Sequence, residues 1–253
     1  MAISISAVIV TLNEEQNIGR CIDSLLGVAD EVIVLDSFST DKTADICRTK
    51  GVKFFQKPWQ GYSTSKNYAN DLATMDYVLS IDADEVLSDE LKHSIIEQKS
   101  NPLSIAYSFN RLTNYCGQWI HYCGWYPDAK IRLFKRGEAT WAGEIHEGLT
   151  FKAATEVKKM PGNLFHYSFP TIASHIRTLN SFSEIAAKDA FFRKKRANFI
   201  VHILLNPFFT FFRKYILQKG FLDGYYGFVI CVISAFANFI KYVKLRELWL
   251  KEM

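Results

Sequence analysis

The chain has 253 residues, of which 49% are hydrophobic and 22% are charged. This composition supports a buried core and excludes a disordered chain, and the length fits one domain with a helical addition. The formal net charge of +4 is unevenly divided, because residues 191–253 contain 11 Lys and Arg but 3 Asp and Glu. This tail therefore carries +8 and the remainder −4. The five cysteines include no C-x-x-C pair, which favours reduced thiols in the cytoplasm over a disulfide-based secreted fold.

The first hundred residues alternate between two hydrophobic patterns. The predicted strands cover 3–10, 31–36, 52–55 and 77–81, and the predicted helices cover 15–27, 41–50, 62–75 and 88–99. This order predicts an α/β fold with a mostly parallel sheet and helices on both faces, in which ligands bind at the carboxyl ends of the strands. From 103 to 167 the pattern changes to short strands. From 171 it is helical, and Pro207 should break or kink that segment.

The sharpest candidate site is the D-x-D sequence Asp82-Ala83-Asp84, which follows the fourth predicted strand. In an extended chain the two carboxylates lie on the same side, about 6–7 Å apart, and repel each other unless a cation lies between them. Mg²⁺ or Mn²⁺ prefers one or two carboxylates together with substrate phosphate oxygens. A solvated acidic turn that caps the next helix is the simpler alternative, but the apolar strand before the pair favours a metal and diphosphate site.

Polar residues also follow the other predicted strands. Asn13 and Glu14 follow the first strand and either cap the next helix or contact a ligand. Asp36 ends the second strand, where it can accept from a nucleotide base or ribose or can cap a helix. Lys66 on the third helix either meets a diphosphate or is an ordinary exposed lysine. No dinucleotide-binding or P-loop glycine motif is present in the sequence.

Four stretches together resemble family 2 glycosyltransferases with a GT-A fold. They are VIVTLNEE at 8–15, VLDSFSTDKT at 34–43, KNYA at 66–69 and LSIDADE at 79–85. The resemblance implies a GT-A, Rossmann-like sheet that binds a nucleotide-diphosphate sugar, with a UDP-sugar favoured. It implies that the sugar nucleotide contacts Thr11, Asn13, Glu14, Asp36, Lys66, Asp82, Ala83 and Asp84. It also implies that Asp84 and Asp82 hold a divalent metal, Mg²⁺ or Mn²⁺.

Three later stretches, 124–136, 141–149 and 220–227, are similar to a subgroup that adds a sugar to the inner core of lipopolysaccharide. The resemblance implies an inverting transfer to a lipid-linked glycan acceptor, which needs one general base for the acceptor hydroxyl. Many members carry a Glu-Asp pair for this purpose, and the second half of this chain has none. The resemblance favours Glu147 as the base, with Glu144 as the alternative and His146 assisting at the diphosphate or orienting an acid. A polar loop is the plainer reading of the same residues.

An acceptor-binding surface is also expected. Trp125, Tyr126 and Trp141 can form a wall on which a sugar stacks, and Arg132 can bind phosphate. For each aromatic residue, packing in the core is the alternative, and for Arg132 the alternative is a surface position.

The tail contains two stretches without charge, 197–212 and 224–240, of 16 and 17 residues, bordered by Lys and Arg. Both fall short of the roughly 20 apolar residues that a spanning helix needs. Short aromatic segments with basic borders are typical of helices in a membrane interface, so 191–253 is predicted to bind an anionic membrane surface. The protein is then cytoplasmic and peripheral on the inner face of the plasma membrane. A helical cap or a dimer interface is the alternative, and no nucleic-acid motif appears in the sequence.

These predictions divide the chain into a catalytic domain at 1–170 and a helical extension at 171–253. Within the first, 1–100 forms the nucleotide-sugar half and 101–170 the acceptor half. Two other functions fit parts of the sequence. A haloacid dehalogenase-type phosphatase would use Asp82 as nucleophile and Asp84 as acid/base, and a non-catalytic membrane adaptor would retain only the fold.

Overall fold

The computed structural model describes residues 3–100, 104–143 and 148–252. The chain forms two compact units, one from Met1–Arg111 with Asp128–Tyr167 and one from Leu112–Pro127 with Ser168–Met253. Residues 112–127 therefore group with the helical tail, although they lie between strands of the first unit. Each unit is described separately below.

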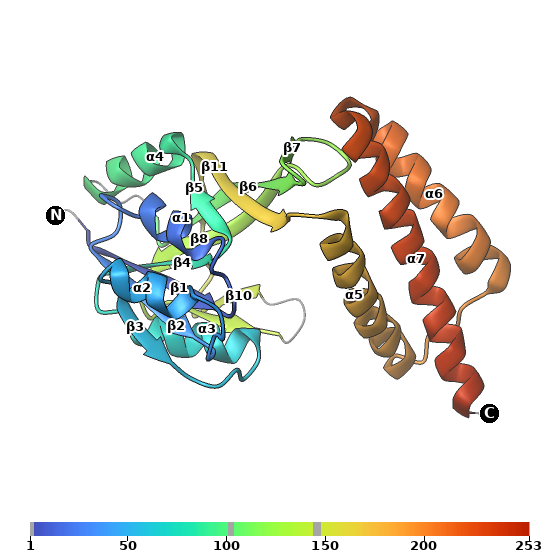
Figure 1. The fold of residues 1–253 in the computed structure, drawn as a ribbon, viewed down its shortest axis with the longest axis horizontal. Coiled ribbons are helices and arrows are strands. Elements are labelled where there is room, and N and C mark those ends of the chain that lie inside the picture. Colours follow the sequence, from blue (N-terminus) through green and yellow to red (C-terminus); the bar gives the residue numbers. More distant parts are fainter. Residues whose placement is uncertain (1–2, 101–103, 144–147, 253) are drawn as a thin grey trace. The chain divides into compact units, whose positions relative to one another are not determined.

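The first unit contains most of the strands (Figure 1). Its first half consists of β1 (Ile5–Thr11), α1 (Ile18–Ser24), β2 (Glu31–Asp36), α2 (Thr43–Thr49), β3 (Lys53–Gln56), α3 (Tyr62–Asp71), β4 (Tyr77–Asp82), β5 (Glu85–Leu87) and α4 (Asp89–Ser100). Its second half contains β6 (Ala106–Tyr115), β8 (Asp128–Lys135), β9 (Ala139–Ala142), β10 (Gly148–Phe151) and β11 (Val157–Phe169), of which β6 and β11 end in the other unit.

The strands form a mixed sheet in the order β3-β2-β1-β4-β8-β6-β11-β5. β1 pairs in parallel with β2 and β4, and β2 pairs in parallel with β3. β8 then pairs antiparallel to β4, and β5 pairs antiparallel to β11. The predicted α/β fold is confirmed, and its sheet is mixed: it is parallel from β3 to β4, and antiparallel pairs follow.

Alternate residues of the parallel strands face opposite sides of the sheet, as the period of two requires. Ala7 and Ile9 on β1 belong to one apolar cluster, which also holds buried residues of α1, α2 and α4. Val8 belongs to a second cluster with Ala69 and Ala73, which lie on or just after α3. Helices therefore cover both faces, so the carboxyl ends of β1, β2 and β4 are where polar side chains can collect.

The second unit is mainly helical. It holds β7 (Gln118–Ile120), α5 (Ile172–Phe192), η1 (Phe199–Leu205), α6 (Asn206–Phe212), η2 (Arg213–Leu217), η3 (Gly220–Asp223) and α7 (Gly224–Glu252). η1 and η2 are π-helical, and Pro207 lies in the first turn of α6. The break expected at Pro207 is thus a change from the π-helix η1 to the α-helix α6. Proline is tolerated there because its missing N–H is not needed in the first turn of an α-helix.

The stretch 220–227 holds this unit together at one end. The carboxylate of Asp223 accepts hydrogen bonds from the backbone N–H groups of His121 at 3.1 Å and Tyr122 at 2.8 Å. A Cβ on Gly220 would lie 2.8 Å from the sulfur of Cys231, and one on Gly227 would lie 2.0 Å from the carbonyl oxygen of Gly220. The glycines are therefore required by close packing, and the acid anchors the 116–123 segment.

Two helical stretches of this unit, Phe199–Leu217 and Gly220–Glu252, are long and apolar enough to cross a membrane by length and composition. They contain 19 and 33 residues, so the prediction that the tail segments are too short to span was wrong on length. The uncharged runs are shorter than the helices, because the helices continue through the basic residues at their borders.

Glu31 is a buried carboxylate at the amino end of β2, away from the predicted site. It accepts hydrogen bonds from Lys53, from the Ser6 hydroxyl and from the backbone N–H of Thr74 at 3.1 Å. Burial raises the pKa of Glu31, but these hydrogen bonds outweigh burial and lower it from 4.5 to about 2. Glu31 therefore stays ionised and joins three segments of the first unit.

We predict that Glu31→Gln lowers the free energy of unfolding at neutral pH by about 1–3 kcal/mol, because buried hydrogen bonds to a charge are lost. Since the folded-state pKa is below the ordinary 4.5, this stabilisation is complete above pH 4.5 and disappears as the pH falls toward 2. Urea unfolding at a series of pH values measures the difference from wild type. Glu156→Gln, at an exposed position, is the matched control. A difference that grows as the pH falls would contradict the assignment.

Candidate active site

The loops that follow β1 and β2 are bound to each other. The N–H of Asn13 donates to Ser39 Oγ at 2.8 Å, and the N–H of Thr40 donates to Asn13 Oδ1 at 2.9 Å. Asn13 has a positive φ of 54°, a conformation that Asn tolerates better than most residues. The N–H of Glu14 donates to Thr43 Oγ1 at 2.8 Å. Asn13 is thus a structural link between the loops, and its predicted contact with a sugar nucleotide stays a prediction.

Asp36 is fully buried and shapes the loop after β2. Its Oδ2 accepts from the N–H of Ser39 and from Gln56 Nε2, both at 2.9 Å, and Oδ1 accepts from Ser39 Oγ. The alternative that Asp36 caps the next helix is wrong, because α2 begins only at Thr43 and Asp36 instead holds the loop before it. Thr11, which ends β1, is also buried, and its Oγ1 has no hydrogen-bond partner among the described residues.

Glu14 is half-buried beside the acidic turn. Burial raises its pKa, Asn17 Nδ2 donates to it at 2.7 Å and lowers the pKa, and the nearby charge of Asp84 raises it further. The net effect is a raised pKa. A carboxylate in this position would gain from any cation that enters the site.

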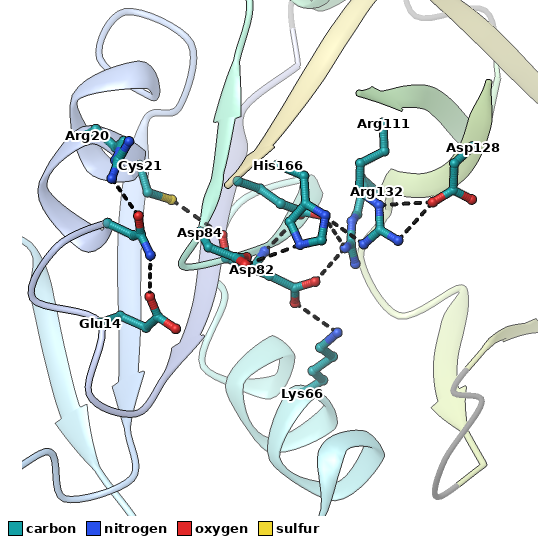
Figure 2. Close-up of polar contacts among 12 residues, drawn as sticks. Glu14, Arg20, Cys21, Lys66, Asp82, Asp84, Arg111, Asp128, Arg132 and His166 are labelled. Atoms are coloured by element: carbon teal, nitrogen blue, oxygen red, sulfur yellow. Dashed lines mark hydrogen bonds and ion pairs between the residues drawn. The ribbon is translucent and has the colours of Figure 1, made fainter. Parts of the chain in front are cut away.

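The two aspartates of the D-x-D sequence do not lie in one extended strand. β4 ends at Asp82, residues 83–84 form a turn, and β5 begins at Glu85. Ala83 is buried in the core below the turn. The expectation that both carboxylates point the same way was wrong, because the turn directs them to different partners (Figure 2).

Asp82 lies between two cations. Its Oδ1 is 2.9 Å from Lys66 Nζ, and its Oδ2 is 2.6 Å from Arg132 Nη2. The side chain of Asp82 is 32% exposed, whereas those of Lys66 and Arg132 are 6% and 4% exposed. Burial raises the pKa of Asp82, but the charges of Arg132 and Lys66 dominate and hold it well below its usual range. Asp82 is therefore a carboxylate with both oxygen atoms already paired.

Arg132 extends this arrangement into a chain of charges. The same Nη2 atom is 2.6 Å from Oε1 of Glu85, a side chain that is fully buried. Glu85 Oε2 accepts from the N–H of Asp82 at 3.0 Å. Arg111 pairs with two carboxylates: its Nη1 is 3.5 Å from Glu85 Oε1, and its Nη2 is 2.8 Å from Asp128 Oδ2. Burial lowers the pKa of Arg132, but Asp82 and Glu85 raise it above its usual value. Arg132 was predicted as an acceptor-side phosphate ligand, and in the structure it supports the D-x-D turn.

Asp84 points to a residue that sequence reasoning missed. Its Oδ2 lies 3.1 Å from Nε2 of His166. β11 pairs with β5 so that His166 is opposite Glu85, and the N–H of Tyr167 donates to the carbonyl oxygen of Asp84 at 2.9 Å. The only sequence signal was a histidine within an apolar, strand-like run at 164–169, and nothing local linked it to residue 84.

One carboxylate and one imidazole side by side suit a divalent cation that takes its other ligands from a diphosphate. Among the described residues, no cluster of three or more His, Cys, Asp or Glu side chains could hold a metal ion without such help. Asp84 fits the predicted metal role by its donor atoms. Asp82, the second predicted ligand, has its carboxylate oxygens in ion pairs with Lys66 and Arg132.

The Lys66-Asn67 pair connects α3 to β9. Lys66 Nζ lies 4.7 Å from the ring centroid of Trp141. Asn67 donates to the carbonyl oxygen of Trp141 at 2.9 Å and accepts from its N–H at 2.8 Å. Ser63 Oγ donates to the carbonyl oxygen of Gly143. The strand that leads toward the predicted base is therefore fixed beside the Lys66–Asp82 pair.

The predicted base residues, Glu144 and Glu147, and the neighbouring His146 lie outside the described residues. The segments on both sides of them are described: Gly148 pairs with Ala142 in the β9–β10 hairpin. The assignment of the base stays a prediction.

The residues predicted to form the acceptor wall belong to different units, and each unit is described by itself. Trp141 is buried in the first unit against Lys66. Trp125 belongs to the core of the second unit, where its ring contacts Tyr115 with centroids 5.8 Å apart, and Tyr126 contacts His121 at 5.7 Å. Packing accounts for the position of Trp125, and its role toward an acceptor stays a prediction.

We predict that Arg132→Met lowers the free energy of unfolding by about 3–5 kcal/mol, because it leaves the buried charge of Glu85 without its closest partner. Arg48→Met is the matched control, since Arg48 forms an exposed ion pair that contributes about 0–1 kcal/mol. Chemical denaturation of both variants measures the two losses. Equal losses would show that the buried charge chain does not stabilise the unit.

Comparison with known proteins identifies the family. The family model described as glycosyl transferase family 2 matches residues 6–159. An uncharacterized glycosyltransferase of Rickettsia typhi is 35% identical, with the alignment covering 98% of this chain and 88% of the relative. The lipopolysaccharide core biosynthesis glycosyltransferase LpsC of Rhizobium meliloti is 27% identical over 96% of this chain and 92% of LpsC.

Among solved structures, glucosyl-3-phosphoglycerate synthase from Mycobacterium tuberculosis, in complex with Mg²⁺ and uridine diphosphate, is 32% identical. That match covers 33% of this chain and 34% of the synthase, with a TM-score of 0.30. The family match over more than half of the chain and the full-length Rickettsia relative lead to one conclusion: the chain belongs to glycosyl transferase family 2.

Proposed function

We propose that this glycosyltransferase inverts the anomeric centre of a sugar as it moves that sugar from a nucleotide diphosphate, most simply UDP, to a lipid-linked glycan. The observation that carries the proposal is the pairing of Lys66 and Arg132 with Asp82, next to Asp84 and His166, at the carboxyl end of β4. This edge is where ligands of such sheets bind. LpsC, by its name a lipopolysaccharide core biosynthesis enzyme, supports a glycan of the lipopolysaccharide core as the acceptor.

The diphosphate of the donor is proposed to bind over the D-x-D turn. Asp84 and His166 would hold a divalent cation, Mg²⁺ or Mn²⁺, which when bound offsets the negative charge that develops on the leaving diphosphate. Lys66 contributes a second positive charge on the same side. The buried Arg132 keeps Asp82 fixed, so Asp82 orients Lys66 without itself repelling the phosphates strongly.

The acceptor hydroxyl oxygen forms a bond to the anomeric carbon as the bond from that carbon to the diphosphate oxygen breaks. The hydroxyl proton passes to the carboxylate of Glu147, the proposed general base, with Glu144 as the alternative. His146 is proposed to assist at the diphosphate. β9, which precedes this segment in the sequence, is held beside Lys66 through Trp141.

The haloacid dehalogenase alternative has less support. Membership in glycosyl transferase family 2 argues against it. In addition, both oxygen atoms of the would-be nucleophile Asp82 are in ion pairs.

We predict that Glu147→Gln abolishes sugar transfer and leaves nucleotide binding near normal, because it removes the proton acceptor but no phosphate contact. Transfer is measured as nucleoside diphosphate release from a panel of sugar nucleotides with and without Mn²⁺, and binding by calorimetry. Asp84→Asn should instead weaken binding in the presence of Mn²⁺. If Glu147→Gln stays active and Glu144→Gln does not, the base is Glu144. Phosphate release from simple phosphomonoesters without nucleotide binding would refute the transferase.

The second unit is proposed to bind the cytoplasmic face of an anionic membrane. Its large apolar side chains are exposed along η1, α6 and α7. α5 runs beside α7 in this unit (Figure 1), with Lys244 of α7 donating to the carbonyl oxygen of Asn180 in α5 at 2.8 Å. α5 carries exposed charges at Arg177, Glu184 and Lys188. If α7 crossed a bilayer, α5 would have to accompany it, and those charges make that costly. We therefore favour insertion into one leaflet over crossing.

We predict that the full-length protein binds vesicles with anionic lipid and that salt weakens this binding. The double change Lys194→Glu with Lys195→Glu should lower the affinity strongly, because each basic residue near an anionic leaflet contributes about 1 kcal/mol. Lys158→Glu with Lys159→Glu in the first unit is the matched control. Vesicle sedimentation measures both, and equal affinities of the two double variants would exclude the tail as the membrane-binding segment.

A further inference from the structure

A groove of about 750 Å³ lies on the second unit, between η1 and α7. It is shallow and largely open to solvent, unlike an enclosed small-molecule pocket. On α7 its lining repeats at helical spacing, so these side chains share one face of the helix. The residues that line it are Phe199, Ile203, Leu204, Phe239, Val243, Arg246, Glu247 and Leu250.

The groove is apolar along its floor and walls. Ile203 is 7% exposed and forms part of the floor, whereas Phe199 and Leu250 are 53% and 57% exposed and form the rim. Apolar surface of this kind is unfavourable in water and gains free energy when an apolar ligand covers it. The lining therefore selects an apolar ligand.

One positive charge lies at this groove. The guanidinium carbon of Arg246 is 5.7 Å from the ring centroid of Phe199, and Arg246 forms no ion pair with any described residue. Glu247, which also lines the groove, pairs with Lys251 at 2.6 Å. The net charge offered to a ligand is thus positive, and it lies beside an apolar channel.

We propose that the groove holds one acyl chain of an anionic phospholipid, with the headgroup phosphate at Arg246. The proposal rests on the membrane location given above and adds a specific lipid site to it. An apolar chain attached to a phosphate matches both the lining and the charge. The neighbouring helix surfaces support a bilayer lipid as the source, because 197–212 and 224–240 carry no charged residue and expose large apolar side chains.

The test uses the full-length protein on phosphatidylcholine vesicles that contain phosphatidylglycerol with a photoreactive diazirine in one acyl chain. After illumination, mass spectrometry maps the labelled peptides. The expected result is label concentrated in 199–204 and 239–250. Val243→Trp, which fills the groove, should remove that label. Phe236→Trp, an exposed position of α7 outside the groove, should leave it unchanged.

A second arm tests the headgroup. Diazirine phosphatidylcholine with the same chain should label the groove less than phosphatidylglycerol. Arg246→Gln should reduce this preference about fivefold, since one basic residue at an anionic leaflet contributes about that factor. Equal labelling by both lipids in the wild type would overturn the assignment of the phosphate to Arg246.

Sedimentation of the same vesicles separates this inference from the proposed function. Protein that binds the vesicles but carries label spread evenly over its apolar helices refutes the groove alone. Protein that does not bind the vesicles refutes the membrane location together with the groove. Label that disappears as the protein dimerises would show that a second copy, and not lipid, covers the groove.

Discussion

The guanidinium of Arg132 is the buried charge on which the candidate site depends. It bridges Glu85, which is fully buried, and Asp82, which is partly exposed. A buried cation is stable only where carboxylates surround it, and those carboxylates are in turn held ionised by it. The chain of charges from Asp128 to Lys66 fixes the end of β4 rigidly. The proposed diphosphate would meet groups that need not rearrange, as electrostatic stabilisation of a transition state requires.

The loops after β1 and β2 are held by hydrogen bonds to backbone and hydroxyl groups instead of ion pairs. Asn13 and Asp36 connect the loops after β1 and β2 through Ser39 and Thr40. In each loop one residue both donates and accepts a hydrogen bond: Asn13 after β1 and Ser39 after β2. The same residues that resemble family motifs therefore also explain the local fold. Two reasons therefore explain why these residues occur in the sequence: the hydrogen bonds that hold the loops together and the proposed contact with a sugar nucleotide.

The sequence predicted what depends on local patterns. Apolar periodicity located the strands and helices of the first hundred residues to within a few positions, because each strand end coincides with a change from apolar to polar residues. At 83–84 the sequence left an extended D-x-D and an acidic turn both open, since the two have the same letters, and the structure has the turn. His166 and Glu85 were missed as site residues for a different reason. Their partners, Asp84 and Arg132, are set by the pairing of β11 with β5 and by the position of β8, which no local pattern encodes.

The second unit is built on a different principle from the first. Besides two apolar clusters, around Tyr115 and around Leu245, its internal contacts use small and polar groups. Gly220 and Gly227 allow close approach, Asp223 receives two backbone N–H groups, and Lys244 donates to Asn180 and Ser183. Many of its large apolar side chains, on η1, α6 and α7, are nevertheless exposed. In water this exposure is unfavourable, because these exposed groups gain nothing from folding. Helices that face lipid show the same pattern: small residues and polar contacts lie between the helices, and apolar residues face the lipid. The exposed apolar side chains therefore support the lipid environment proposed for the second unit.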